Sequence, residues 1–253
     1  MRGPTRRGHY NGRVHPPIRA ITLDLDDTVW PVAPAIVRAE AALESFFARH
    51  APRAAQQWPS AARQELRRQL DRERPHLAHD MSAQRRWMIE RMLEEAGEDT
   101  ALADAAYDAY FTARCQVEHY PDSLAALERL AARVPLAAVS NGNACLRTIG
   151  IDHLFSFQLG AGEFGAPKPE PGIFLAACER LGVPPGQILH VGDDPACDIA
   201  GAQRAGLRTC WIHRPGAFHD RMPEGAPPPD LHLPSLSALA DWLEATHDTE
   251  PSP

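Results

Sequence analysis

The chain contains no apolar run long enough to cross a membrane or to serve as a signal peptide. It also lacks a C-x-x-C pair: its five cysteines stand singly, which argues against a disulfide framework and favours a reduced, cytoplasmic setting. Basic residues are not in excess, since the formal charge is -7 and five arginines lie in the first 19 residues, which hold no Asp or Glu. The remaining chain is more acidic still, so we expect neither a nucleic acid nor a membrane as partner.

The composition is that of an ordinary globular protein, with 253 residues, 44% of them hydrophobic and 23% charged. A chain of this length can bury a sizeable core together with a smaller companion domain. Residues 1–17 are basic and interrupted by Gly and Pro, which predicts a disordered tail, and residues 245–253 are expected to form a second one. Both a monomer and a dimer stay open.

Hydrophobic periodicity predicts two kinds of structure. Residues 18–23 are apolar and partly β-branched, as in a buried strand of a parallel sheet. The next block has no strand-like run, and its spacing predicts helices over 35–50, 60–74, 82–96 and 100–117. Strands and helices then alternate, with strands predicted over 136–139, 155–159, 188–191, 209–212 and 231–233, and helices over 122–132, 171–181, 198–205 and 235–244.

This alternation predicts an α/β fold, a doubly wound parallel sheet or Rossmann-like core with an inserted helical cap domain. The core would comprise residues 18–30 and 119–244, and the cap residues 31–118. The cap would therefore interrupt the core directly after its first strand.

The first predicted strand ends in an unusual concentration of negative charge. In an extended chain Asp24 and Asp26 share a face, whereas Leu25 and Asp27 point the other way. Two converging carboxylates indicate a hard metal ion with oxygen ligands. The alternative is an acidic turn or helix cap, for which Asp and Thr are also well suited. Asp27 is expected to have that second role.

Two further strands also stop on polar signatures, Ser140-Asn141 and Gly192-Asp193-Asp194. The carboxyl ends of the strands of a doubly wound sheet share one edge, where ligands bind, so these signatures should meet in space. Lys168 lies in a loop after the third strand, between two prolines that restrict its backbone. We expect its ammonium to be aimed at the same edge.

The ordered set Asp-x-Asp-x-Thr, Ser-Asn, Lys-Pro and Gly-Asp-Asp-x-x-x-Asp resembles the haloacid dehalogenase superfamily of phosphatases, over about residues 18–244. The inserted helices resemble the cap of one large subgroup. The resemblance implies Asp24 as nucleophile, Asp26 as general acid and base, and Thr28 as a residue that helps to position Asp26. It implies a Mg²⁺ ion held by Asp24, the backbone carbonyl of Asp26, and Asp193.

The same resemblance assigns the remaining polar residues. Ser140 and the backbone N–H of Asn141 would donate to phosphoryl oxygens, and Lys168 would stabilise the charge of the transition state. Asp198 would hold either Lys168 or a metal-bound water. Asp194 would either touch the metal site or cap the helix that follows it.

The expected function is a Mg²⁺-dependent phosphomonoester hydrolase acting on a small-molecule phosphate ester. A phosphotransferase or mutase of the same fold, and a binding protein without turnover, are the alternatives. The acid at Asp26 favours phosphate esters over halides, because superfamily members that cleave carbon–halogen bonds do not need it.

The stretches 28–30, 140–143 and 188–194 resemble the bacterial flavin-pathway phosphatases, which act on 5-amino-6-(5-phospho-D-ribitylamino)uracil and FMN. Val29 and Trp30 depart from that pattern, and residues 162–166 are less basic, so a general sugar-phosphate or nucleotide phosphatase is the fallback. The candidate substrate contacts are Trp30, Asn143, His79 and Arg85, where Trp30 would stack on a ring. A solvated helix face is the alternative for Arg85, and a second metal site the less favoured one for His79.

Overall fold

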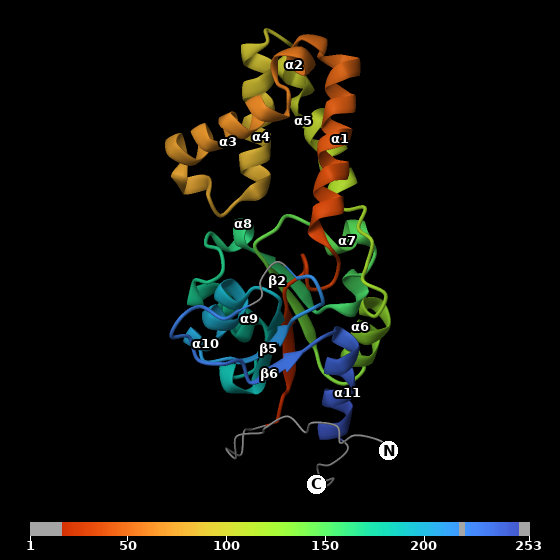
Figure 1. Ribbon diagram of the computed structural model, residues 1–253, viewed down its shortest axis with the longest axis vertical. Helices are drawn as coiled ribbons and strands as arrows, with labels where there is room; N and C mark the ends of the chain where they lie inside the picture. The colour runs from red at the N-terminus through yellow and green to blue at the C-terminus, as the bar shows by residue number, and fades with distance from the viewer. Residues whose placement is uncertain (1–16, 218–220, 248–253) are drawn as a thin grey trace.

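The computed structural model describes residues 17–217 and 221–247, which form a parallel sheet of six strands and two sets of helices (Figure 1). The strand order is β3-β2-β1-β4-β5-β6, and every neighbouring pair is parallel. The strands are β1 Ala20–Leu23, β2 Leu136–Ser140, β3 Phe157–Gly160, β4 Ile188–Gly192, β5 Arg208–Ile212 and β6 Leu231–Leu233. The predicted α/β class with a doubly wound parallel sheet is confirmed.

Helices cover both faces of the sheet because the buried strands carry apolar side chains on both sides. On one face Ile21 and Leu23 of β1 pack against α6, α7 and α11. On the other face Val139 of β2 and Ile188 of β4 pack against α9 and α10. The core helices are α6 Ser123–Ala131, α7 Leu146–Ile149, α8 Ala161–Phe164, α9 Pro171–Leu181, α10 Gly201–Arg204 and α11 Leu236–His247.

The helical region between β1 and α6 has its own apolar core, made chiefly from α1, α3, α4 and α5. Its helices are α1 Val32–His50, α2 Pro52–Gln57, α3 Ser60–Glu73, α4 Met81–Glu95 and α5 Ala103–Arg114. Pro52 lies just beyond the end of α1 and begins α2, since a proline at the first helical position gives up an N–H that has no partner there. This region is the helical cap.

The cap lies beyond the carboxyl ends of the strands, at one end of the molecule (Figure 1). The chain enters it after Trp30 and leaves it after Arg114. Arg38 of α1 fastens the cap to the returning segment, because its guanidinium donates to the Gln116 carbonyl at 2.5 Å and to Glu118 Oε1 at 3.0 Å. A ligand at this edge of the sheet therefore lies between core and cap.

Most of the two predicted tails lies outside the described residues. All five cysteines are free, as their spacing predicted. Among the described helices, none has the length and apolarity needed to span a membrane.

Candidate active site

The polar strand ends meet at the point where the strand order reverses, between β1 and β4. Asp24 follows β1 directly, and its N–H donates to the Val191 carbonyl of β4 at 2.9 Å. Asp193 follows β4. Both carboxylates line a cavity of about 340 Å³ between the sheet edge and the cap. This is the crevice in which open α/β sheets bind ligands.

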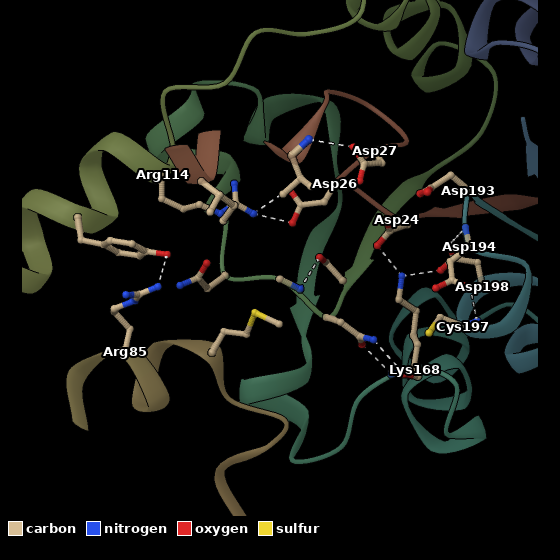
Figure 2. A pocket seen from close by; sticks show the side chains of 18 of the residues that line it. Asp24, Asp26, Asp27, Arg85, Arg114, Lys168, Asp193, Asp194, Cys197 and Asp198 are labelled. Atoms are coloured by element: carbon tan, nitrogen blue, oxygen red, sulfur yellow. Dashed lines mark hydrogen bonds and ion pairs between the residues drawn. The ribbon is translucent and has the colours of Figure 1, made fainter. Parts of the chain in front are cut away.

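Lys168 connects Asp24, which follows β1, to Asp198, which lies beyond β4 (Figure 2). Its Nζ donates to Asp24 Oδ1 at 2.5 Å and to Asp198 Oδ1 at 2.6 Å, and its side chain is buried. Burial lowers the pKa of Lys168, but Asp198 and Asp24 raise it and prevail, so the ammonium stays charged. Lys168 is the only lysine in the sequence. The prediction that it is aimed at the strand ends is confirmed.

A chain of buried bonds extends behind Asp198. His190 is fully buried, with Nε2 3.3 Å from Asp198 Oδ1 and Nδ1 2.9 Å from Thr22 Oγ1. Burial lowers the pKa of His190, so the ring is neutral, and it can donate to Asp198 while accepting from Thr22. Burial raises the pKa of Asp198, but Lys168 and His190 lower it and prevail. Asp198 is thus held as a carboxylate, and of its two predicted roles it has the one of holding Lys168.

Asp24 and Asp193 place a buried and a half-buried carboxyl group close together. Burial raises the pKa of Asp24 to about 7, with Lys168 opposing the shift and Asp198 adding to it. Burial and then the Asp24 charge raise the pKa of Asp193 to about 8. Oxygen atoms of Asp24, Asp193 and Asp198 all lie within 4.8 Å of one another. Both Asp198 oxygens accept bonds, Oδ1 from Lys168 and Oδ2 from the Asp194 N–H, whereas the bond from Lys168 to Asp24 uses Oδ1 alone. A cation would therefore face Asp24 and Asp193, and this all-oxygen donor set fits Mg²⁺.

The Asp26 carboxylate points toward the cap rather than toward Asp24 (Figure 2). Arg114 Nη2 donates to its Oδ1 at 2.7 Å and its Oδ2 at 2.5 Å, and Trp30 Nε1 donates to Oδ1 at 2.8 Å. The metal contact predicted for Asp26 uses its backbone carbonyl. Its side chain is not part of the cluster of Asp24, Asp193 and Asp198.

The structure corrects two expectations for residues that follow β1, Thr28 and Trp30. Thr28 was expected to help to position Asp26, but its hydroxyl donates to Asp193 Oδ1 at 2.9 Å, because the turn after β1 directs it toward β4. Trp30 was expected to stack on a substrate ring, but its indole is fully buried in the core cluster and offers no exposed face. The two residues hold carboxylates in place instead.

The Ser-Asn motif, Ser140 and Asn141, lines the cavity on the core side. Ser140 is buried at the end of β2, and its Oγ accepts the Gly142 N–H at 3.0 Å. Asn141 clamps the backbone of Lys168: its Nδ2 donates to the Lys168 carbonyl at 2.9 Å, and its Oδ1 accepts the Lys168 N–H at 2.7 Å. The sequence predicted Asn141 as a backbone donor only. Its side chain also connects the Ser-Asn motif to the Lys-Pro motif.

The remaining two acidic residues of the motifs cap helices. Asp27 has a φ of 60° and accepts the Val32 N–H at 2.9 Å at the start of α1, as expected of a turn or cap residue. Asp194 accepts the N–H groups of Ala196 at 2.8 Å and Cys197 at 3.0 Å, which is the capping role, and it also lines the cavity at Asp24.

The cap side of the cavity is formed by Ile36, Arg67, Met81 and Arg85. Arg85 lies over the Tyr110 ring at 4.2 Å and donates to Glu40 Oε1 at 2.6 Å, so it is a cavity residue rather than part of a solvated face. A second cavity of about 520 Å³ between the cap helices shares Ile36, Arg67 and Arg85 with the first.

Asn143 lines both the cavity at Asp24 and a third cavity, where it is joined by His79. His79 therefore lies beside the site, and Asn143 lies in it. Asp80 accepts the Ala83 N–H at 2.9 Å as the cap of α4, and no metal cluster includes His79 among the described residues.

Arg114 and His190 belong to the site but were not predicted. His190 gave a weak signal, as the one titratable residue in a strand expected to be buried on both faces. Arg114 gave none, because an arginine at the end of a cap helix is indistinguishable in sequence from a solvated one.

Residues 18–206 match the model of a family of hydrolases, the haloacid dehalogenase-like hydrolases. The chain is 36% identical over 199 residues to 5-amino-6-(5-phospho-D-ribitylamino)uracil phosphatase YigB of Escherichia coli, with 77% of this chain and 83% of the relative covered. It is 32% identical over 244 residues to phosphoserine phosphatase of Thermus thermophilus, with 87% and 96% covered. It also resembles the crystal structure of 2-haloacid dehalogenase from Pseudomonas syringae, with a TM-score of 0.83, 39% identity, and 91% and 99% covered.

Proposed function

Because the chain belongs to the haloacid dehalogenase-like hydrolases and is a phosphoric monoester hydrolase, we propose that it acts through an aspartyl-phosphate on Asp24. We propose 5-amino-6-(5-phospho-D-ribitylamino)uracil or FMN as its substrate, and a wider set of sugar phosphates or nucleotides as the second candidate. The observation that carries the mechanism is the bond of 2.5 Å between Lys168 Nζ and Asp24 Oδ1 at the floor of the cavity.

In the first step an Asp24 oxygen attacks phosphorus and the bond from phosphorus to the ester oxygen breaks. Lys168 holds Asp24 in place and faces the charge that spreads over the phosphoryl oxygens. Asn141 keeps Lys168 in position through its two bonds to the Lys168 backbone. Ser140 lies at the same floor and would donate to a phosphoryl oxygen.

Asp26 carries the proton in both steps. In the first step its carboxyl gives a proton to the leaving alkoxide, and in the second its carboxylate takes one from the water that attacks the aspartyl-phosphate. Phosphate is then released and Asp24 is regenerated. Asp26 is suited to this task because it lines the cavity on the side opposite the bonded residues Asp24, Lys168 and Asp198.

The raised pKa values of Asp24 and Asp193 support a Mg²⁺ ion at these two residues, because a cation would return both to the charged form. When bound, it would neutralise the charge gathered by the two carboxylates and the phosphate and would orient the phosphate for attack. Thr28 would keep Asp193 turned toward it.

The cap wall supports a substrate whose leaving group is larger than a simple sugar. Ile36 and Met81 are large apolar residues that are 37% and 43% exposed, and both line the cavity at Asp24. They offer a surface for a heterocycle, whereas Arg67 and Arg85 offer donors to its polar substituents. Asn143 would contact the ribityl or sugar part. His79 lies in the adjoining cavity and is a weaker candidate.

The function is tested by steady-state kinetics with Mg²⁺ on FMN, the ribitylaminouracil phosphate, ribose 5-phosphate and nucleoside monophosphates. We expect kcat/KM for one of the first two to exceed the others by about tenfold or more, the discrimination that one additional pocket contact supplies. The Asp24→Asn variant should release no phosphate. A flat profile would favour the second candidate, and undiminished release by Asp24→Asn would refute the mechanism.

The likeness to a 2-haloacid dehalogenase is tested in the same assay with 2-chloropropionate. We expect no release of chloride. Asp26 and its partner Arg114 serve proton transfer to an alkoxide, a step for which a halide leaving group has no need.

A further inference from the structure

The last cap helix, α5, ends on Arg114, and its guanidinium lies on the Asp26 carboxylate. Nη2 alone contacts both carboxylate oxygens, at 2.7 and 2.5 Å. The Arg114 side chain is 2% exposed, whereas that of Asp26 is 20% exposed. Burying a guanidinium is costly unless it is well paired, so an arginine at this position needs a specific reason.

The core is shaped around this pair. Trp30, at the entrance to the cap, donates its indole N–H to the same carboxylate at 2.8 Å. Gly142 passes directly over Asp26: a Cβ there would clash with Asp26 Oδ2 and would lie 3.4 Å from Arg114 Nη2. Asp26 is therefore held from both points at which the chain crosses between core and cap, and a loop of the core leaves space for the arrangement.

Arg114 is not optimised as a purely structural residue. Its Nε and Nη1 are buried, and neither has a hydrogen-bond partner among the described residues. A guanidinium that served only to fasten the cap would be expected to satisfy its donors, because each unpaired one costs free energy. Arg114 also lines the cavity that contains Asp24, so its position follows the reacting groups.

We propose that Arg114 is a positioning residue that places the Asp26 carboxyl for proton transfer to the leaving group. The inference rests on the proposed function, in which Asp26 is the acid and base. Because Arg114 belongs to the cap and Asp26 to the core, the acid is in place only while the cap stands over the cavity as it does here. Nucleophilic attack by Asp24, which the core alone supports, does not depend on Arg114.

Esters with different leaving groups separate these two functions. An alkoxide needs a proton as it departs, whereas p-nitrophenolate leaves without one. For Arg114→Met we expect kcat/KM for an alkyl phosphate to fall by about hundredfold, the size of a general-acid contribution, and that for p-nitrophenyl phosphate by less than about fivefold. The ratio kcat/KM is the appropriate measure because it ends at the first irreversible step and excludes the later hydrolysis. An equal loss for both esters would overturn the proposal.

A double-mutant cycle then tests whether Arg114 acts through Asp26. In the Asp26→Asn background, Arg114→Met should change kcat/KM for the alkyl phosphate by less than about twofold, since the group that it positions is already absent. Effects that multiply would show that Arg114 acts on its own and would overturn the proposal.

Arg38→Met is the matched control, because Arg38 also fastens the cap to the segment that returns to the core, through charged and polar bonds, but lies outside the cavity. It should leave the ratio of the alkyl and aryl rates unchanged. If Arg114→Met does not fold, as judged by circular dichroism and urea unfolding, Arg114→Lys replaces it: the ammonium should hold the alkyl phosphate rate within about tenfold of wild type. A larger selective loss for an unrelated cap variant would contradict the proposal.

Failure of the proposed function gives a different result. If wild type releases no phosphate from any ester, or if Asp24→Asn is as active as wild type, the function is wrong and the role of Arg114 is wrong with it. If both controls behave as expected and only the leaving-group or double-mutant results disagree, the role of Arg114 alone is wrong.

Discussion

The core side and the cap side of the site differ in how their charged groups are held. On the core side Lys168, Asp198 and His190 are all buried, and Asp198 is bonded to the other two. On the cap side Arg67 is 41% exposed and pairs with Asp71, which is 54% exposed. The core therefore fixes one arrangement of atoms, whereas the part of the cap wall around Arg67 can rearrange around a ligand.

The physical basis of this difference is solvent. Buried charges interact strongly, and a broken bond leaves a partner without compensation, so such a network tolerates only one geometry. Exposed pairs contribute little, since water and salt replace them readily. A cavity with one wall of each kind can keep the chemistry constant while its selectivity for the leaving group changes. On the cap side Arg114 is as buried as the core groups and Arg85 is 15% exposed, so the contrast applies to the wall around Arg67.

The strongest test of the comparison is to remove one buried cation from each side. Lys168→Met leaves Asp24 and Asp198 buried without their partner, and we expect the free energy of unfolding to fall by about 3–5 kcal/mol. Arg63→Met removes a cap arginine whose side chain is 8% exposed and whose partners Glu44 and Glu40 are 55% and 29% exposed, and should cost about 1 kcal/mol or less. Urea unfolding followed by circular dichroism, with EDTA present, measures both. Equal losses would refute the difference between the two sides.

The next test uses pH and Mg²⁺. Burial raises the folded-state pKa of Asp24 to about 7 and of Asp193 to about 8, against an ordinary value of 3.8 for both. Their contribution to stability is therefore complete below about pH 4 and is lost as the pH rises through 7 to 8. The metal competes with these protons, so Mg²⁺ should stabilise the protein more at about pH 8 than at about pH 5, by roughly 2 kcal/mol near saturation.

The difference between wild type and Asp193→Asn isolates this effect from other titrating groups. The variant should lose most of the Mg²⁺-dependent shift in the urea midpoint and should show a flatter pH profile with EDTA. A Mg²⁺ effect that is independent of pH would mean that the raised carboxyl groups are not its ligands.

The core side could be predicted from the sequence and the cap side largely could not. Asp24, Lys168 and Asp193 lie just after strands or in the loops between them, and the topology of a parallel sheet brings all such positions to one edge. An apolar run that stops on a polar residue is visible in the sequence, so those residues could be named without any knowledge of side-chain packing. Lys168 is also conspicuous as the only lysine in the chain.

What could not be predicted depends on which way a side chain turns. Thr28 contacts Asp193, 165 residues away, and Arg114 contacts Asp26, 88 residues away. Neither partner follows from spacing, because each depends on the packing of two elements that are distant in sequence. The burial of Trp30 has the same origin, since the turn that follows β1 points its indole into the core.

A smaller effect on activity is expected from adding a single methyl group at Gly142, where the core contacts Asp26 and Arg114. Gly142→Ala places a Cβ against Asp26 Oδ2, and since overpacking costs about 1–3 kcal/mol, we expect kcat/KM to fall by about tenfold to hundredfold. Gly160→Ala is the matched control, because Gly160 is paired in register with Ser140 on the neighbouring strand, and a Cβ there meets nothing within 4 Å. A neutral Gly142→Ala would show that Asp26 is not confined by the core.

The smallest effect should come from the adaptable wall itself. Ile36 is 37% exposed at the cavity mouth, so Ile36→Ala removes only part of an apolar contact, about 1 kcal/mol, which corresponds to about a fivefold loss in kcat/KM for FMN. Ribose 5-phosphate carries no heterocycle to contact this wall and should be hydrolysed at the wild-type rate. Leu124→Ala is the matched control, since Leu124 is 41% exposed on α6 and lines none of the three cavities next to the site. If Ile36→Ala slowed both substrates equally, the cap wall would contribute to the reaction as much as to recognition, and the contrast between the two sides would fail.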